Sequence, residues 1–222
     1  MSDDVLRIED RSTLQERVTM AIRKAILDGY WKDGEKIRQE EISQMLSVSR
    51  MPIREALKQL AQEGLITLEH HRGAIVNPIT EKDVLEVYEL RSRLESLAVE
   101  LAVPNLDEET LRTLDHYNVK MQEAADNQNV VNYIALNREF HFLIYKNADW
   151  RRLGILINTL WSGLPPYAPS LLANQIVLSN EDHVRLLDFL RKRDAAKASE
   201  LMCQHIRRTG AEILEYVRKR NQ

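Results

Sequence analysis

The chain has 222 residues, of which 44% are hydrophobic and 29% charged, and its formal net charge is -3 at pH 7. This composition excludes an intrinsically disordered chain and is typical of a globular protein that can bury a core. A single cysteine, Cys203, excludes an intramolecular disulfide framework, and no apolar run approaches the roughly 18 residues that cross a membrane. We therefore expect a cytoplasmic protein without membrane contact, whose binding to nucleic acid would need a local basic face.

The first 78 residues predict a winged helix-turn-helix domain after a flexible segment over residues 1–10. Apolar stripes at helical spacing predict helices, and alternating apolar residues around a glycine-containing tip predict a hairpin. Asp28-Gly29 ends the first helix, because glycine tolerates the left-handed conformation found after helices. The expected helices cover 13–27, 39–46 and 49–63, an extended piece covers 35–37, and the hairpin strands cover 65–68 and 74–76.

The helix that starts near Ser49 has the features of a DNA-recognition helix. The Ser49 hydroxyl is suited to capping it, and Pro52 lies in the first turn, where a missing N–H costs little. Arg50 and Arg54, four residues apart, share one face near the N-terminus, where a recognition helix contacts base edges. Because two such arginines are usually just a solvated face, this interpretation depends on the surrounding motif.

Residues 79–222 predict an all-helical domain of about six helices. Pro78 breaks the preceding strand, and Thr80 can cap a new helix. The expected helical segments are 80–102, 107–126, 129–147, 150–172 with an interruption at Pro165-Pro166, 178–192 and 194–219. The predicted fold class is therefore mainly α, with an N-terminal winged helix-turn-helix and a C-terminal helical bundle.

Three histidines, His141, His183 and His205, lie on three different helices of the expected bundle, each among apolar neighbours at helical spacing. Asn137 lies one turn before His141 and projects from the same face. Three inward imidazoles can hold one divalent ion such as zinc or nickel. A lone histidine on an apolar helix is, however, more often a hydrogen-bonded core residue, so the spacing leaves both possibilities open.

Arg91 faces inward on the helix 80–102 and is a candidate to bind a ligand carboxylate through two parallel hydrogen bonds. An internal ion pair with Glu95, one turn further on, explains the same position equally well. Several aromatic residues are candidates to line a pocket, although aromatic residues at helical spacing are more often core; they are Tyr88, Tyr133, Trp161 and Tyr167.

Specific motifs in the first 78 residues resemble the DNA-binding domain of GntR-type bacterial transcription regulators. They are Trp31-x-x-Gly34, Ser47-Val-Ser-Arg-Met-Pro-Ile-Arg-Glu-Ala-Leu57, Glu63-Gly-Leu-Ile66 and Arg72-Gly-Ala-x-Val76. The resemblance covers residues 11–78 and implies a homodimer on a palindromic double-stranded DNA operator. The residues expected to contact DNA are Arg50 and Arg54 at base edges or phosphates, Ser49 and Arg38 at phosphates, Met51 at a thymine methyl, and Arg72 and Gly73 at the wing tip.

The second half resembles the FCD ligand-sensing domain of the FadR-like branch of the same family. The resemblance lies in Tyr88-x-x-Arg91-x-x-x-Glu95, Asn137-x-x-x-His141 and one histidine on each of the last two helices. It implies a divalent metal held by Asn137, His141, His183 and His205, and a small organic acid bound near Arg91 and Tyr88. Aspartate is common where this chain has Asn137, and the uncharged amide should bind the metal more weakly.

We therefore expect a sequence-specific DNA-binding transcriptional regulator, a repressor that is released by a small carboxylate effector. The alternative is a metal-dependent enzyme built on the three histidines, with an open coordination position for substrate. No general base is evident for it, because Glu139 points away from the side of the helix that carries His141. A third possibility is a DNA-binding protein without a sensor, whose histidines are ordinary core residues.

Overall fold

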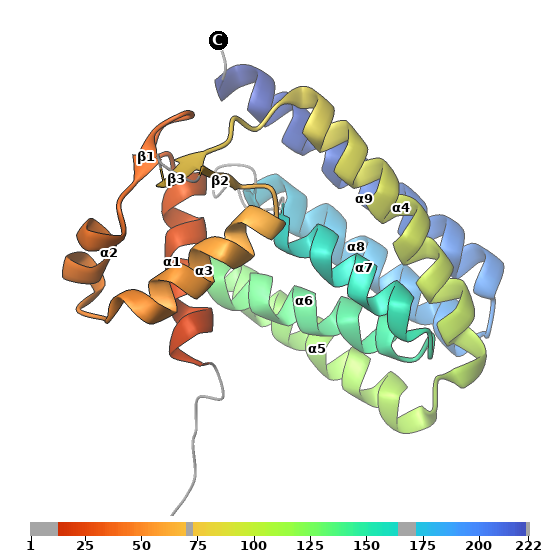
Figure 1. The fold of residues 1–222 in the computed structure, drawn as a ribbon. Coiled ribbons are helices and arrows are strands. Elements are labelled where there is room, and N and C mark those ends of the chain that lie inside the picture. Colours follow the sequence, from red (N-terminus) through yellow and green to blue (C-terminus); the bar gives the residue numbers. More distant parts are fainter. Residues whose placement is uncertain (1–12, 70–72, 164–171, 221–222) are drawn as a thin grey trace, which may run out of the picture. The chain divides into compact units, whose positions relative to one another are not determined.

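A computed structural model of the chain describes residues 13–69, 73–163 and 172–220 (Figure 1). The chain divides into two compact units, residues 1–78 and 79–222. No helix in the described ranges has the length and apolarity to cross a membrane. Several sequence predictions fall outside these ranges, namely those for residues 1–10, Arg72, Pro165, Pro166 and Tyr167.

The described part of the first unit contains three helices and a small antiparallel sheet of order β1-β3-β2. The extended piece expected before the second helix is a third strand, which pairs Lys36 with Ile75. In the hairpin, Ile66 pairs with Val76 and Glu69 with Gly73. The elements are α1 (Leu14–Leu27), β1 (Lys36–Ile37), α2 (Gln39–Leu46), α3 (Arg50–Gln62), β2 (Ile66–Glu69) and β3 (Gly73–Val76).

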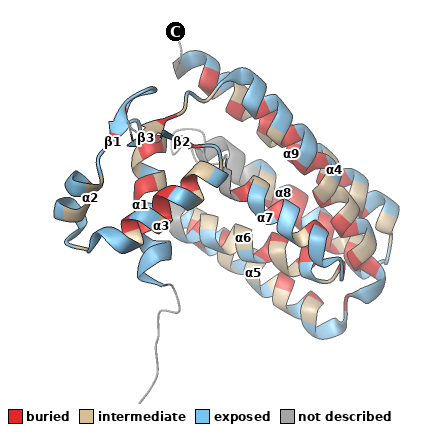
Figure 2. Cartoon of the chain, viewed as in Figure 1, coloured by how far each residue is buried: buried red, intermediate tan, exposed pale blue. Residues whose placement is uncertain are grey.

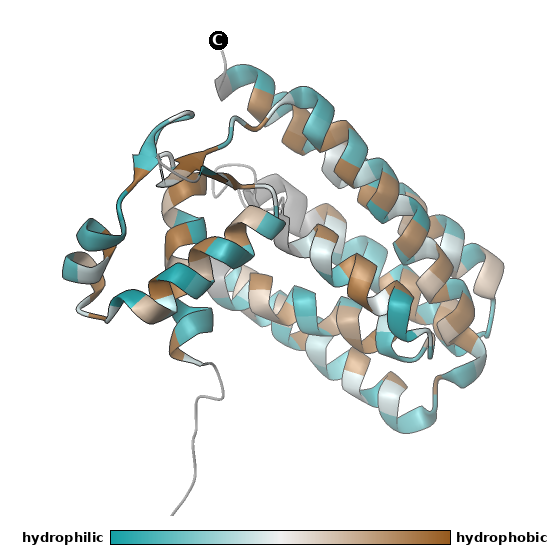
Figure 3. Cartoon of the chain, in the orientation of Figure 1, coloured by the Kyte–Doolittle hydropathy of each residue, from teal (hydrophilic) through white to brown (hydrophobic). Residues whose placement is uncertain are grey.

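The core of the first unit forms because the apolar stripes of α1 and α3 face each other and the sheet closes over them. Ile22 on α1 and Ile53 and Leu57 on α3 are almost completely buried. Hydrophobic and hydrophilic residues alternate around these helices (Figure 3), as expected for helices that bury one face. Burial of this stripe leaves the opposite face of α3, with its arginines, in solvent.

The prediction that the Ser49 hydroxyl caps α3 is wrong. Ser49 has the extended backbone of an N-cap residue, but its side chain makes no capping hydrogen bond. An N-cap hydroxyl accepts from the second or third backbone N–H of the helix, and here the third position is Pro52, which has none.

Within its described residues, the second unit contains six α-helices and a short 3-10 segment. They are α4 (Glu81–Ala102), η1 (Val103–Asn105), α5 (Glu108–Asp126), α6 (Val130–Lys146), α7 (Arg151–Gly163), α8 (Leu172–Arg191) and α9 (Ala195–Arg220). The expected start of α8 at residue 178 is wrong by six residues, because no glycine or proline stops the helix between Leu172 and Leu178. Thr80 and Asp83 form the reciprocal capping box that starts α4.

Helices α4 and α9 lie side by side and make the most extensive helix pairing of the second unit. Their facing sides are buried while the outer sides are exposed (Figure 2). The close approach depends on Gly210 of α9, because a Cβ at that position would lie 2.6 Å from Cβ of Tyr88 on α4. Gly154 of α7 is also helical, but a Cβ added there meets nothing within 4 Å.

These two glycines give a matched pair of substitutions. We expect Gly210→Ala to lower the free energy of unfolding by roughly 1–3 kcal/mol, because the added methyl forces α4 and α9 apart. Gly154→Ala should raise it by about 0.5–1 kcal/mol, because alanine has the higher helix propensity and the site is open. Urea denaturation measures both, and equal stability of the two variants would contradict the α4–α9 contact.

Candidate functional site

The exposed face of α3 carries the arginines expected to read DNA. Arg50 is the first residue of the helix, and Arg54 follows one turn later. Their side chains are 69% and 62% exposed, and Met51 between them is 69% exposed. The structure thus presents a basic surface with one apolar side chain at a helix N-terminus, where backbone N–H groups also favour anions.

Each arginine of this region lies near a carboxylate. Arg50 Nη2 is 2.6 Å from Oε1 of Glu40, and Arg54 Nε is 3.6 Å from Oε1 of Glu55. Arg38, the N-cap of α2, pairs with Glu41 at 3.5 Å. The contact between Glu40 and Arg50 was not predicted from the sequence, because the two residues lie ten positions apart. Exposed pairs of this kind contribute at most about 1 kcal/mol, so phosphates or bases can replace these carboxylates.

The first residue of β3 must be glycine. Gly73 begins β3 with φ +87°, a conformation that other residues adopt only with strain. A Cβ at this position would also lie 3.3 Å from Cε of Lys36 on the neighbouring strand. The absence of a side chain lets the backbone approach a partner closely.

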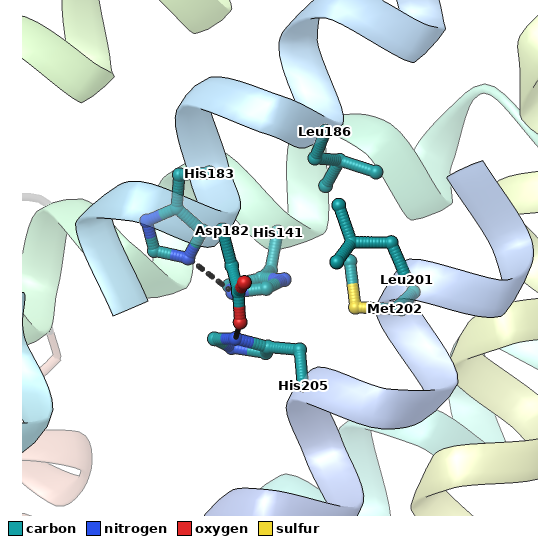
Figure 4. A pocket seen from close by; sticks show the side chains of 7 residues that line it. All are labelled: His141, Asp182, His183, Leu186, Leu201, Met202 and His205. Atoms are coloured by element: carbon teal, nitrogen blue, oxygen red, sulfur yellow. Dashed lines mark hydrogen bonds and ion pairs between the residues drawn. The ribbon is translucent and has the colours of Figure 1, made fainter. Parts of the chain in front are cut away.

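In the second unit the three predicted histidines converge. His141 comes from α6, His183 from α8 and His205 from α9, and all three are buried. One nitrogen from each ring lies within 4.8 Å of the others, and the Nε2 atoms of His141 and His183 are 3.2 Å apart. Figure 4 shows the rings in a closely packed pocket whose lining is His141, Asp182, His183, Leu186, Leu201, Met202 and His205.

The pocket contains Asp182 and does not include Asn137. Asn137 is half-buried one turn before His141, and its role as a ligand stays a prediction. Asp182 Oδ2 lies 3.2 Å from Nδ1 of His205 and 2.6 Å from Nη1 of Arg208. Although partial burial opposes it, these hydrogen bonds lower the pKa of Asp182. Sequence reasoning missed Asp182, because neighbours on a helix point about 100° apart and Asp182 directly precedes His183.

Burial keeps His141 and His183 neutral. It lowers the pKa values of His141 and His183 well below the ordinary histidine range, and the neighbouring imidazoles lower them further. A neutral imidazole has a free lone pair on one ring nitrogen, and it binds metal through that nitrogen. At a separation of 3.2 Å, at most one of the two facing Nε2 atoms carries a proton.

A buried carboxylate next to the cluster connects three helices, α4, α6 and α7. Glu95 of α4 is fully buried and accepts a hydrogen bond of 2.5 Å from the Tyr145 hydroxyl of α6. Its other oxygen accepts from Trp161 Nε1 of α7 at 2.9 Å and from Arg91 Nε at 2.7 Å. Burial and the adjacent Glu95 charge raise the pKa of Tyr145, so the phenol keeps its proton. The Tyr145 oxygen in turn lies 3.0 Å from Nδ1 of His141.

Arg91 forms the internal ion pair that was one of its two predicted roles. Although burial opposes its charge, the Glu95 carboxylate raises the pKa of Arg91, so the guanidinium is charged. The guanidinium lies 4.5 Å from the Trp161 ring centroid and 4.9 Å from that of Tyr88. Its Nη1 is buried without a hydrogen-bond partner among the described residues. Such an atom is costly unless an anion or water satisfies it.

Comparison with known families agrees with both halves of the structure. Residues 14–76 match the model of bacterial regulatory proteins of the gntR family, and residues 86–208 match that of the FCD domain. The chain therefore belongs to the GntR family of bacterial regulators and carries an FCD domain.

Individual relatives support the same conclusion. The gluconate operon transcriptional repressor of Bacillus subtilis is 32% identical over 78% of this chain and 70% of its own length. YdhC of the same species, an HTH-type transcriptional regulator, is 36% identical over 61% of each chain. The structure of E. coli McbR/YncC has the same fold, with a TM-score of 0.74, 24% identity and coverage of 92% of this chain and 98% of that one.

These findings identify a DNA-binding transcriptional regulator. They exclude the metal-dependent enzyme, because the matching families and the named relatives are regulators. The three-histidine pocket is therefore best understood as part of a regulatory domain.

Proposed function

We propose that the protein is a homodimeric repressor whose binding to a palindromic operator is controlled by a small carboxylate effector in a metal-containing helical domain. The observation that carries the proposal is the convergence of three buried imidazoles beside a buried arginine, in a chain whose helix α3 exposes two arginines. One winged domain reads only a short half-site, and two copies related by a two-fold axis read a palindrome.

On DNA, Arg50 and Arg54 take base edges or adjacent phosphates, and Met51 contacts a thymine methyl. Ser49 binds phosphate, which its exposed hydroxyl supports because that hydroxyl makes no capping bond. Arg38 is a further phosphate contact. Gly73 and Arg72, which lies outside the described residues, approach the backbone or minor groove at the wing.

Substitution of the arginines tests this interface. We expect Arg50→Ala and Arg54→Ala each to weaken binding to DNA from upstream of the gene by roughly 5–150-fold, the effect of losing one base contact. Fluorescence anisotropy at fixed salt measures the loss. Arg93→Ala is the charge-matched control, because Arg93 is an exposed arginine of the second unit. Equal effects of all three substitutions would contradict a specific role for α3.

The histidine cluster fits a divalent ion. Two nitrogens bound to one tetrahedral zinc at 2.0–2.1 Å are about 3.3 Å apart, and the observed Nε2–Nε2 separation is 3.2 Å. Neutral imidazoles suit zinc, nickel and related ions. His141, His183 and His205 would hold the ion, with Asn137 or Asp182 as the oxygen donor. When bound, the ion supplies a positive centre that attracts a carboxylate.

Arg91 supports a carboxylate effector. Its buried Nη1 can donate to an anion while its Nε stays on Glu95. The pocket that the histidines line has no room for an organic acid, so an effector must displace some of the lining side chains. Met202 and Leu201 line it, and the flexible thioether of Met202 can move with little strain.

Metal binding distinguishes a metal-containing sensor domain from a helical domain whose histidines are ordinary core residues. We expect the metal-free protein to bind about one equivalent of zinc or nickel and to gain thermal stability, since an ion that binds only the folded state stabilises it. His183→Ala should abolish the gain, and the exposed His116→Ala should retain it. Elemental analysis and thermal denaturation with and without a chelator measure both. The same metal content in the two variants would remove the site.

A further inference from the structure

The direction of one buried hydrogen-bond chain assigns a role to residues outside the histidine cluster. We propose that Tyr145 and Glu95 are positioning residues that hold His141 with its proton on Nδ1, so that its Nε2 faces the cluster as a metal ligand. The inference rests on the proposed metal site for its functional meaning. The hydrogen-bond chain that it describes exists in the metal-free protein and can be tested there.

The chain of hydrogen bonds runs from α6 to α4. Tyr145 lies one turn after His141 on α6, and its oxygen is 3.0 Å from His141 Nδ1. The same oxygen is 2.5 Å from Oε2 of Glu95 on α4. All three side chains are buried, so bulk water does not compete for these groups.

The number of available protons determines which group donates in each hydrogen bond between His141, Tyr145 and Glu95. A phenol has one proton, and the Glu95 carboxylate, paired with Arg91, can only accept. The short O–O distance therefore places the phenolic proton towards Glu95. The Tyr145 oxygen can then only accept from His141, which requires a proton on Nδ1. Met202 Sδ, 3.6 Å from the same hydroxyl, is too weak an acceptor to change this order.

The tautomer decides whether the ring can bind metal. A neutral imidazole with its proton on Nδ1 has its lone pair on Nε2, and this atom lies 3.2 Å from His183 Nε2 inside the cluster. The opposite tautomer would place a proton where the ion must bind. Residues that fix the tautomer of a metal-binding histidine typically change metal affinity 10–100-fold when they are mutated.

The other two histidines lack this constraint. His183 Nδ1 is buried without a hydrogen-bond partner among the described residues. His205 Nδ1 faces both the carboxylate of Asp182 at 3.2 Å and the guanidinium of Arg208 at 3.3 Å, which favour opposite proton positions. His141 is therefore the ring whose orientation and tautomer the fold fixes most strongly.

Another tyrosine of the protein, Tyr133, is a matched control for Tyr145. Tyr133 lies on the same helix, is equally buried, and donates its hydroxyl to Oδ1 of Asn180 at 3.0 Å, with no histidine in that bond. Tyr133→Phe and Tyr145→Phe each remove one buried hydroxyl together with the hydrogen bond that it donates. A purely structural role for Tyr145 would give the two variants similar properties.

Imidazole 15N NMR of the metal-free protein tests the tautomer directly, with His141→Gln assigning the signals. We expect wild type and Tyr133→Phe to show His141 with its proton on Nδ1, and Tyr145→Phe to show a mixture of tautomers. A wild-type His141 protonated on Nε2, or identical spectra for the two phenylalanine variants, would overturn the proposal. The wild-type spectrum alone shows which nitrogen of His141 carries the proton, so the proposal can be tested even if Tyr145→Phe fails to fold.

Metal affinity then tests the functional meaning. In competition with a chromophoric chelator, Tyr145→Phe should bind zinc 10–100-fold more weakly than wild type, whereas Tyr133→Phe should stay within about 2-fold. Equal affinities of both variants would overturn the positioning role. Absence of zinc binding by wild type would instead refute the proposed metal site, and the NMR result would still decide the direction of the hydrogen-bond chain.

Discussion

The helical domain depends on one fully buried carboxylate. Glu95 is surrounded by protein, so its charge and both of its oxygens must be satisfied by neighbouring side chains. Arg91, Tyr145 and Trp161 do so from α4, α6 and α7. Removing one partner of a buried pair leaves an uncompensated charge and destabilises the protein by roughly 3–5 kcal/mol. This requirement restricts how α4, α6 and α7 can pack against one another.

The same carboxylate contacts both groups to which we assign a role in the proposed regulation. On one oxygen it holds Arg91, the candidate anchor for an effector, and on the other it holds the phenol that contacts His141. A hydrophobic residue at this position would satisfy packing without connecting these groups. The polar interior is therefore consistent with a sensing domain rather than with a simple structural bundle.

Sequence periodicity predicted most of the fold and the three histidines, because each histidine lies among apolar neighbours at helical spacing. It could not predict how helices distant in sequence meet. Tyr145 was visible as a neighbour of His141, but its bond to Glu95 spans 50 residues and follows from packing of α4 on α6. Asp182 was hidden for the same reason, since its contact with His205 depends on α9. The prediction of a Ser49 cap took no account of Pro52, which is visible in the sequence and removes one of the two N–H groups that could donate to the hydroxyl.

In the proposed sensor, three imidazoles of the helical domain share one ion. X-ray absorption at the metal edge of zinc-loaded protein measures the ligand set directly. We predict three imidazole nitrogens at about 2.0–2.1 Å, falling to two in His183→Ala, with the remaining positions filled by oxygen. A spectrum with one imidazole or none, or one unchanged by that substitution, would contradict the account.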